Sequence, residues 1–249
     1  MGEWRKRLAN RLRLWSRDVS GQIARDLAEW APTVSGTLLD LGCGDKPYAH
    51  LFENVTACVG VDLPDSRSAS KMPKRPDLFA DLAALPFRDA GFDSVLSTQA
   101  LEHVAEPAAV LMEAARVLRD DGIILLTIPF LAAEHEEPHD YFRFTSYGIV
   151  SLLKRSGFTD IRVKKQFGFW SAIGEMVYWH FHRKVCGSRW EKFWFAVGTT
   201  LFLRAFHLLN RLDSDDKLVL NLLATARRLP RACADQPELT EPAVAGVHP

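Results

Sequence analysis

Short apolar runs alternate with amphipathic stretches along most of this chain. Apolar runs of this kind, each ending near a glycine, an aspartate or a polar turn, are typical of buried parallel strands. We expect strands at residues 37–41, 55–61, 78–80, 92–97, 122–130, 158–167 and 217–226. Strands that alternate with helices predict a parallel sheet with helices on both faces. The expected fold is therefore an α/β, doubly wound, mostly parallel seven-stranded sheet of the Rossmann-like type.

Helical signals fill several intervals between these strands. Pro107 fits the first turn of one helix, and Thr145 or Ser146 can cap another that ends near Gly157. A helix is also expected directly after the glycine turn that follows the first strand.

The first thirty residues repeat an apolar position every three or four residues, from Trp4 to Trp30, with arginines on the other faces. This spacing predicts an N-terminal helical cap over residues 1–31, in which Ser20-Gly21 offers a break. Simple packing on the domain is one interpretation. A lid over the active site, or a basic helix on a membrane surface, are the others.

The remaining segments divide the chain into a core and two appendages. Residues 32–168 form the expected core, and residues 213–229 supply its final strand. Between them, residues 169–212 are rich in tryptophan and phenylalanine and predict a helical insertion before the last strand. This insertion could be a lid, a dimer surface or a peripheral membrane contact. Residues 230–249 are rich in proline and alanine and predict a disordered tail.

Charge and cysteine content exclude several classes of protein. Lys+Arg and Asp+Glu both number 31, so no overall basicity points to nucleic acid as a partner. The four cysteines form neither a CxxC pair nor a dense framework, as expected for a reduced cytoplasmic protein. The longest strongly apolar run, residues 193–203, is shorter than the ~20 residues of a membrane-spanning helix.

Candidate chemistry begins at the end of the first expected strand. Gly42 and Gly44 form a Gly-x-Gly turn, where the backbone can approach a ligand. Asp62 ends the second strand, eighteen residues after Gly44, where a carboxylate can accept hydrogen bonds from ribose hydroxyls. Pro47 replaces the third glycine of a dinucleotide site, and Asp45 would repel a pyrophosphate. The pattern favours a nucleoside cofactor without a phosphate.

The segment Asp40-Leu41-Gly42-Cys43-Gly44 resembles the first motif of class I S-adenosylmethionine-dependent methyltransferases. Further blocks follow in the family's order, and the resemblance covers roughly residues 38–167. The matching blocks are Val59-Gly60-Val61-Asp62, Ala80-Asp81-Leu82 with Leu85-Pro86-Phe87, Phe92-Asp93-Ser94-Val95 through Leu101-Glu102-His103-Val104, and Arg116-Val117-Leu118-Arg119-Asp120-Asp121-Gly122.

The resemblance implies that S-adenosylmethionine is the cofactor. Its binding residues would be Asp40, Gly42, Cys43, Gly44, Asp62, Leu63, Asp81, Leu82 and Gln99. Within this set, Asp62 would hold the ribose, Leu63 would pack on the adenine, and Gln99 would face the sulfonium. The segment Asp45-Lys46-Pro47-Tyr48 departs from the many members that have another glycine at position 46. A bacterial subgroup shares this segment and a Pro-His-Asp-Tyr-x-Arg-Phe-Thr loop, so it is taken as a variant.

Residues 134–144 follow the fifth expected strand and are dense in titratable groups. We expect His139 or His135 to act as a general base on a substrate hydroxyl, with Asp140 orienting the imidazole. Substrate contacts are expected from Tyr141, Arg143 and His103. The alternatives are that Asp140, Tyr141 and Arg143 only pin the loop, and that His103 is either a second candidate base or a packing residue.

The letters His135-Glu136-Glu137-Pro138-His139 match the H-E-x-x-H motif of zinc proteases. That motif needs a helix, on which residues i and i+4 share one face, and Pro138 would break it. No metal site is therefore expected in this protein.

These patterns predict methyl transfer from S-adenosylmethionine to a small-molecule, glycan or lipid-linked acceptor, at an oxygen atom. The alternatives from other classes are a non-catalytic S-adenosylmethionine-binding module and a membrane-surface adaptor on the same fold. The oligomeric state stays open.

Overall fold

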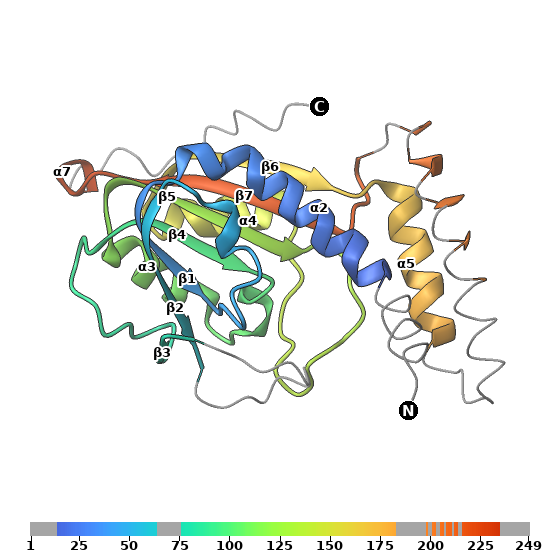
Figure 1. Ribbon diagram of the computed structural model, residues 1–249, viewed down its shortest axis with the longest axis horizontal. Helices are drawn as coiled ribbons and strands as arrows, with labels where there is room; N and C mark the ends of the chain where they lie inside the picture. Colours follow the sequence, from blue (N-terminus) through green and yellow to red (C-terminus); the bar gives the residue numbers. More distant parts are fainter. Residues whose placement is uncertain are drawn as a thin grey trace.

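The computed structural model describes residues 14–63, 76–182, 198, 201–202, 205–206, 208–210, 212–213 and 216–234. Its centre is a seven-stranded sheet with the order β3-β2-β1-β4-β5-β7-β6 (Figure 1). The strands are β1 (Gly36–Leu41), β2 (Val55–Asp62), β3 (Leu78–Phe79), β4 (Phe92–Thr98), β5 (Leu118–Pro129), β6 (Phe158–Gln166) and β7 (Asn221–Arg228). The expected α/β sheet of seven strands is confirmed.

Strand direction divides the sheet in two. All pairings from β3 to β5 are parallel, whereas β7 is antiparallel to both β5 and β6. Because β6 and β7 are antiparallel, β6 ends and β7 begins at the same edge of the sheet. A strand that returns from that edge needs no crossover and pairs antiparallel.

Helices cover both faces of the sheet. The helices are α2 (Leu14–Trp30), α3 (Pro107–Val117), α4 (Ser146–Arg155), α5 (Phe169–His182) and the short α7 (Arg231–Ala234). Helix α4 begins as expected, because the Thr145 hydroxyl accepts a hydrogen bond from the Gly148 backbone N–H at 3.0 Å. Helix α7 lies within the segment expected to be disordered, and residues 235–249 lie outside the described residues.

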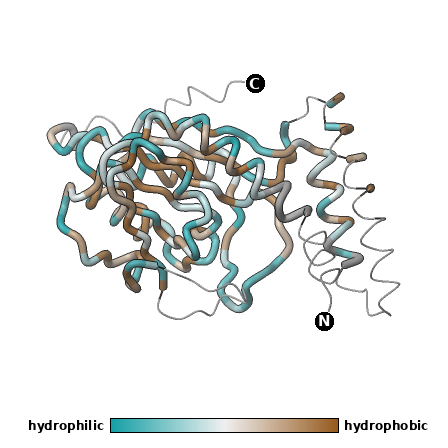
Figure 2. The backbone as a smooth tube through the Cα atoms, in the orientation of Figure 1, coloured by the Kyte–Doolittle hydropathy of each residue, from teal (hydrophilic) through white to brown (hydrophobic). Residues whose placement is uncertain are grey.

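Alternate residues along the central strands belong to two separate hydrophobic clusters. Leu38 and Leu96 pack with α2 residues Ile23 and Leu27 on one face of the sheet. On the other face, Leu39 packs in the cluster that contains the buried residues of α3 and α4. Figure 2 shows the hydrophobic colour concentrated along the central strands. A sheet with both faces covered explains why its strands read as near-continuous apolar runs.

Helix α2 packs on the sheet through buried residues of its carboxyl-terminal half. It runs through Ser20-Gly21 without a break, and Ile23 and Leu27 are buried. The buried Asp26 accepts a hydrogen bond from Lys164 on β6 at 2.8 Å. Packing on the domain is therefore the interpretation that fits these residues, and residues 1–13 of the expected cap lie outside the described part.

The expected α-helix after the Gly-x-Gly turn is absent from the described residues. The chain there forms turns and a short 3₁₀ helix, η2 (Ala49–Leu51). Lys46 has a φ of 56°, and it precedes Pro47, whose ring disfavours the right-handed helical region for the residue before it. The prediction of a helix starting at Gly44 was therefore wrong.

Helix α5 opens the aromatic insertion and lies beyond the carboxyl ends of β4 and β5 (Figure 1). Asn210, near the end of the insertion, contacts the start of helix α5. Its side-chain oxygen accepts the backbone N–H of Trp170 at 2.9 Å. Within the described residues, no helix combines the length and apolar character needed to cross a bilayer.

Candidate functional site

The glycine turn after β1 leaves space at the carboxyl edge of the sheet. Gly42 and Gly44 have φ values of +68° and +54°. A Cβ on Gly42 would lie 2.4 Å from the Cβ of Ala100, whereas a Cβ on Gly44 would meet nothing within 4 Å. Gly42 thus allows close packing on the segment after β4, and Gly44 borders open space in which a ligand could lie.

Asp62 connects this turn to the end of β2. One carboxylate oxygen accepts the Gly44 backbone N–H at 2.9 Å, and the other accepts the Leu63 N–H at 2.8 Å. The residue is only 5% exposed. The two elements that the sequence proposed as one nucleoside site are therefore adjacent, and the hydrogen bond to Gly44 fixes their relative position.

Asp40 lies directly below the turn with an unsatisfied oxygen. The residue is 2% exposed, and its Oδ1 has no hydrogen-bond partner among the described residues. Burial raises the pKa of this carboxyl to about 7, although the Lys46 ammonium opposes the rise. A buried carboxyl that lacks a partner beside open space fits a site for a ligand that brings donors or positive charge.

The variant segment at residues 45–48 is anchored to the sheet by a side chain. The Lys46 ammonium bonds to Asp77, which also accepts the Gly60 N–H at 2.7 Å. A Cβ on Gly60 would collide with the side chains of Lys46 and Cys43. Burial raises the pKa of the Cys43 thiol to about 12, so Cys43 fills space as an un-ionised thiol.

The residues expected around the adenine follow the end of β2. Leu63 is 40% exposed, which leaves its side chain accessible for stacking. Asp81 is exposed and accepts the Ala83 N–H at 2.9 Å, whereas Leu82 is buried. The backbone of Ala80 donates to the Asp62 carbonyl at 3.0 Å, so these residues share one corner of the sheet with Asp62.

Gln99 follows β4 in a left-handed backbone conformation, with a φ of 50°. Its side-chain N–H groups donate to Asn221 at 2.9 Å and to Thr127 at 3.3 Å. The amide nitrogen is therefore engaged with the ends of β5 and β7. Asn221, which the sequence did not single out, sets the orientation of Gln99.

Arg143 braces the loop that follows β5. Its Nε donates to the Ala132 carbonyl at 3.1 Å, and its two terminal nitrogens donate to both Asp140 carboxylate oxygens at 2.7 Å. Further bonds reach the carbonyls of Ala133 and Phe142. Of the two interpretations of Arg143, these contacts support the bracing one.

Asp140 stabilises the loop backbone and does not contact the ring of His139. Its carboxylate accepts the His135 N–H at 2.9 Å and lies 3.4 Å from the His135 ring. Burial opposes ionisation, but hydrogen bonds from Arg143 and His135 lower its pKa to about 2. The partner of the His139 ring is the Tyr141 hydroxyl, at 3.0 Å. Of the two histidines that Asp140 was expected to orient, the one whose ring lies near its carboxylate is therefore His135 and not His139.

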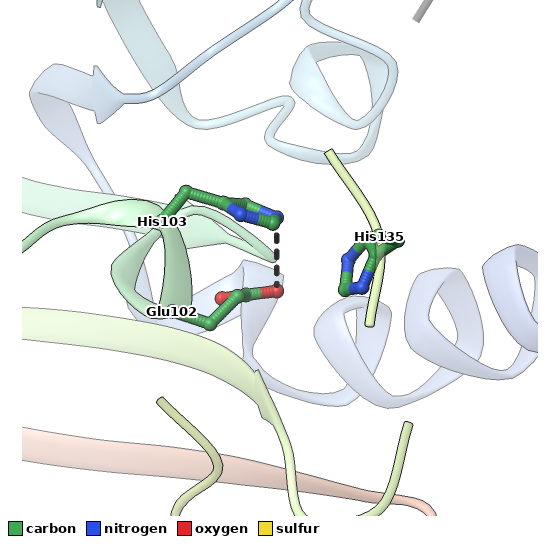
Figure 3. Close-up of side chains that lie close together, drawn as sticks. All are labelled: Glu102, His103 and His135. Atoms are coloured by element: carbon green, nitrogen blue, oxygen red, sulfur yellow. Dashed lines mark ion pairs between the residues drawn. The ribbon is translucent and has the colours of Figure 1, made fainter. Parts of the chain in front are cut away.

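A carboxyl that the sequence did not single out lies beside His103. Glu102 in the 3₁₀ helix η3 (Leu101–His103) is fully buried, and within the described part of the chain neither of its carboxylate oxygens has a hydrogen-bond partner. Burial raises its pKa to about 8. Figure 3 shows the side chains of Glu102, His103 and His135 turned toward one another. The only signal in the sequence was a charged residue between Leu101 and His103 in an apolar block.

The ring of His103 is fixed by the loop. Its Nδ1 lies 2.8 Å from the carbonyl oxygen of His139, which requires that Nδ1 carry the proton and leaves Nε2 with a free lone pair. Burial lowers the pKa of this imidazole. The backbone carbonyl of Glu102 accepts the N–H of Tyr141 at 2.9 Å, so η3 and the loop are connected in both directions.

Comparison with known proteins identifies the central segment. Residues 39–126 match the family model described as a methyltransferase domain. A protein of Mycobacterium tuberculosis named "Probable S-adenosylmethionine-dependent methyltransferase" is 31% identical over 134 residues, which are 50% of this chain and 49% of that protein. The O-methyltransferase rstn1 of Aspergillus nomiae is 28% identical over 168 residues, 57% of this chain and 75% of that protein. The chain spans about half the length of the mycobacterial relative.

Solved structures share the fold at low sequence identity. The [4+2]-cyclase SpnF has a TM-score of 0.52 at 20% identity, covering 84% of this chain and 80% of that chain. A methyltransferase structure from Bacillus halodurans has a TM-score of 0.50 at 17% identity, covering 82% of this chain and 99% of that chain. At such identities these likenesses support the α/β Rossmann-like fold only.

Proposed function

From the class I methyltransferase domain at residues 39–126, whose cofactor is S-adenosylmethionine, we propose that this protein transfers a methyl group to an oxygen atom of an acceptor. The acceptor classes are a small molecule, a glycan or a lipid-linked molecule. The observation that carries the proposal is the hydrogen bond from Gly44 to Asp62 beside the open space at the carboxyl edge of the sheet.

The residues of this edge fit an adenosine that bears a charged sulfur. We assign the ribose to Asp62, because its carboxylate oxygens can each accept more than one hydrogen bond. We assign the adenine to the exposed face of Leu63 and to Asp81 with Leu82. The methionine end then extends along Gly42, Cys43 and Gly44 toward Gln99, above Asp40, whose Oδ1 lacks a protein partner.

Methyl transfer requires little from the protein beyond alignment of the cofactor and the acceptor. S-adenosylmethionine supplies a methyl group on a sulfonium, which is an excellent leaving group. The chain holds the acceptor in line with that methyl group and excludes water. We assign the removal of the acceptor's proton to His139, which is only partly buried and whose Nδ1 lies 3.0 Å from the Tyr141 hydroxyl. In this arrangement Tyr141 contacts the acceptor and orients the imidazole.

Two observations support the choice of acceptor. The A. nomiae relative is named as an O-methyltransferase, and this chain covers 75% of its length. The insertion exposes large apolar side chains at Met176, Leu208 and Leu212. An acceptor with an apolar portion, or a membrane surface that carries one, would cover these side chains.

Calorimetry with S-adenosylhomocysteine and a labelled-methyl transfer assay test this function together. We expect the wild-type chain to bind the product and to label at least one member of an acceptor panel of phenols, sugar nucleotides and polyprenyl-linked sugars. Product binding without label transfer to any of them would instead support a non-catalytic binding module. Co-sedimentation with acidic vesicles, without product binding, would support a membrane-surface adaptor.

A further inference from the structure

Glu102, His103 and His135 come from two separate parts of the chain and form one cluster. Glu102 and His103 lie in η3 after β4, and His135 lies in the loop after β5. Each offers one ligand atom, and these atoms all lie within 4.8 Å of one another. Figure 3 shows the carboxylate and both rings facing a common centre. Among the described residues, no other group of this kind meets the same criterion.

The Glu102 carboxyl gives this cluster an unsatisfied buried acceptor. It is completely buried, and neither oxygen has a hydrogen-bond partner among the described residues. Nε2 of His103 lies 3.9 Å from its Oε1. Burying a carboxyl without partners is costly. A bound cation in the centre of the cluster would provide the missing partner for both oxygens.

Both imidazoles are oriented as metal ligands usually are. Nδ1 of His103 lies 2.8 Å from the His139 carbonyl, and Nδ1 of His135 lies 3.0 Å from the Ala133 carbonyl. A ring that donates its Nδ1–H to a backbone carbonyl keeps the Nε2 lone pair for a metal ion. With both Nδ1 atoms bonded to carbonyls, the Nε2 lone pairs and a Glu102 oxygen are the groups available to an ion.

The charged groups around the cluster also favour a cation. The carboxylate of Glu136 lies 3.9 Å from Nε2 of His103, and Asp140 lies 3.9 Å from its Nδ1. The opposing charge is Arg143, whose terminal nitrogen lies 3.4 Å from Nδ1 of His135. Arg143 is itself paired with both oxygens of Asp140, which offsets its charge within the loop.

We propose that Glu102, His103 and His135 bind a divalent transition-metal ion, with zinc as the best match. Two imidazoles and one carboxylate are the ligand set of catalytic zinc sites, which keep a fourth position open for water or substrate. Ligand atoms of a tetrahedral zinc ion lie roughly 3.5 Å apart, so binding requires the cluster to contract by about 1 Å. This proposal departs from the expectation of no metal site, which was argued from His135 with His139 on a helix, whereas this set uses different partners.

The position of the cluster suggests what the ion would do. A Cβ on Gly42 would touch Ala100, the residue before η3, so the cluster lies next to the cofactor turn. Resting on the proposed methyl transfer, the open coordination position would hold the acceptor's oxygen and facilitate loss of its proton. Metal binding itself requires neither the cofactor nor the acceptor.

Zinc titration of the chelator-treated full-length chain tests the site. We expect one zinc ion per chain in the wild type, and affinity reduced roughly 100-fold or more in His135→Asn, His103→Asn and Glu102→Gln, because each removes a direct ligand. The matched controls are His50→Asn, an exposed histidine on η2, and His139→Asn, the other histidine of the H-E-x-x-H letters. Both should keep wild-type affinity.

Two further measurements keep the test decisive. Thermal unfolding of each metal-free variant shows whether it is folded, and His135→Asn is the safest variant because its side chain is 40% exposed. Cobalt in place of zinc should give visible absorption bands that His135→Asn loses. Absence of stoichiometric zinc in the wild type, or unchanged affinity in folded His135→Asn, would overturn the metal site. Calorimetry with S-adenosylhomocysteine on the same proteins separates this failure from failure of the cofactor pocket.

Discussion

The cofactor turn and the loop after β5 lie at the same edge of the sheet, yet they are held together differently. At the turn, the backbone N–H groups of Gly44 and Leu63 each donate to one carboxylate oxygen of Asp62. At the loop, side chains brace one another, with Arg143 bonded to Asp140 and to three backbone carbonyls. Backbone contacts suit a cofactor shared by many enzymes, and side-chain contacts allow a loop to change with the acceptor.

Each region also holds one buried carboxyl with an unsatisfied oxygen. Asp40 lies below the turn and Glu102 lies below the loop. Folding does not favour such groups, so their presence at the same edge indicates that ligands, rather than the core, satisfy them. The following predictions separate the two regions, starting with the largest effect.

Asp40→Asn should change the pH dependence of stability. The pKa of Asp40 is raised to about 7 in the folded chain, so the folded state keeps a proton that the unfolded state releases above pH ~4. Wild-type stability therefore falls as pH rises from ~4 to ~7, by an amount on the order of 4 kcal/mol. Thermal unfolding at pH 5 and pH 8 should show the variant gaining stability relative to wild type. A constant difference, as expected for exposed Asp45→Asn, would contradict the assignment.

Asp62→Ala should remove most of the affinity for S-adenosylhomocysteine. The change deletes the acceptor of the Gly44 N–H and the carboxylate assigned to the ribose. Because hydrogen bonds to a charged group are lost, we expect the affinity to fall roughly 100-fold. Calorimetry measures it. Glu53→Ala, an exposed carboxylate before the amino end of β2, is the control. Equal affinity in both variants would rule out Asp62 as a ligand.

Arg143→Lys should affect turnover and leave cofactor affinity unchanged. Lysine keeps the charge but cannot bond both oxygens of Asp140 and the loop carbonyls at once. We expect turnover of an identified acceptor to fall roughly 10-fold, at about 1.4 kcal/mol per factor of ten. Should the affinity for S-adenosylhomocysteine fall by a similar factor, the two regions would not be independent.

Gly44→Ala should weaken product binding with a small effect on the fold. A Cβ there meets no protein atom, but the φ of +54° disfavours alanine by about 1 kcal/mol. The added methyl group enters the space assigned to the cofactor, so we expect roughly 10-fold weaker binding. Gly42→Ala is the contrasting variant, because its Cβ would overlap Ala100; it should lower the melting temperature more. Unchanged product binding in Gly44→Ala would place the ligand elsewhere.

Local signals in the sequence predicted the cofactor side well. The apolar runs placed all seven strands, and the Gly42–Gly44 turn and Asp62 meet as the spacing predicted. Neighbouring residues specify the backbone of a strand followed by a turn, so a short segment of sequence is enough to predict that structure. The helix after Gly44 failed because Lys46-Pro47 alters the local backbone.

The acceptor side was harder to predict because its contacts join residues far apart in the sequence. His103 is paired with the backbone of His139, thirty-six residues away. No periodicity marks Glu102 as unsatisfied, since that follows only from how η3 packs beneath the loop. For the same reason the sequence left open which of the two histidines Asp140 approaches, and in the structure it is His135.

A crystal structure with S-adenosylhomocysteine tests the central claim most directly. We predict both ribose hydroxyls within hydrogen-bond distance of the Asp62 carboxylate, with the homocysteine portion extending over Gly44. A product molecule bound away from the turn between β1 and β2, with Asp62 still bonded only to the protein, would contradict the account.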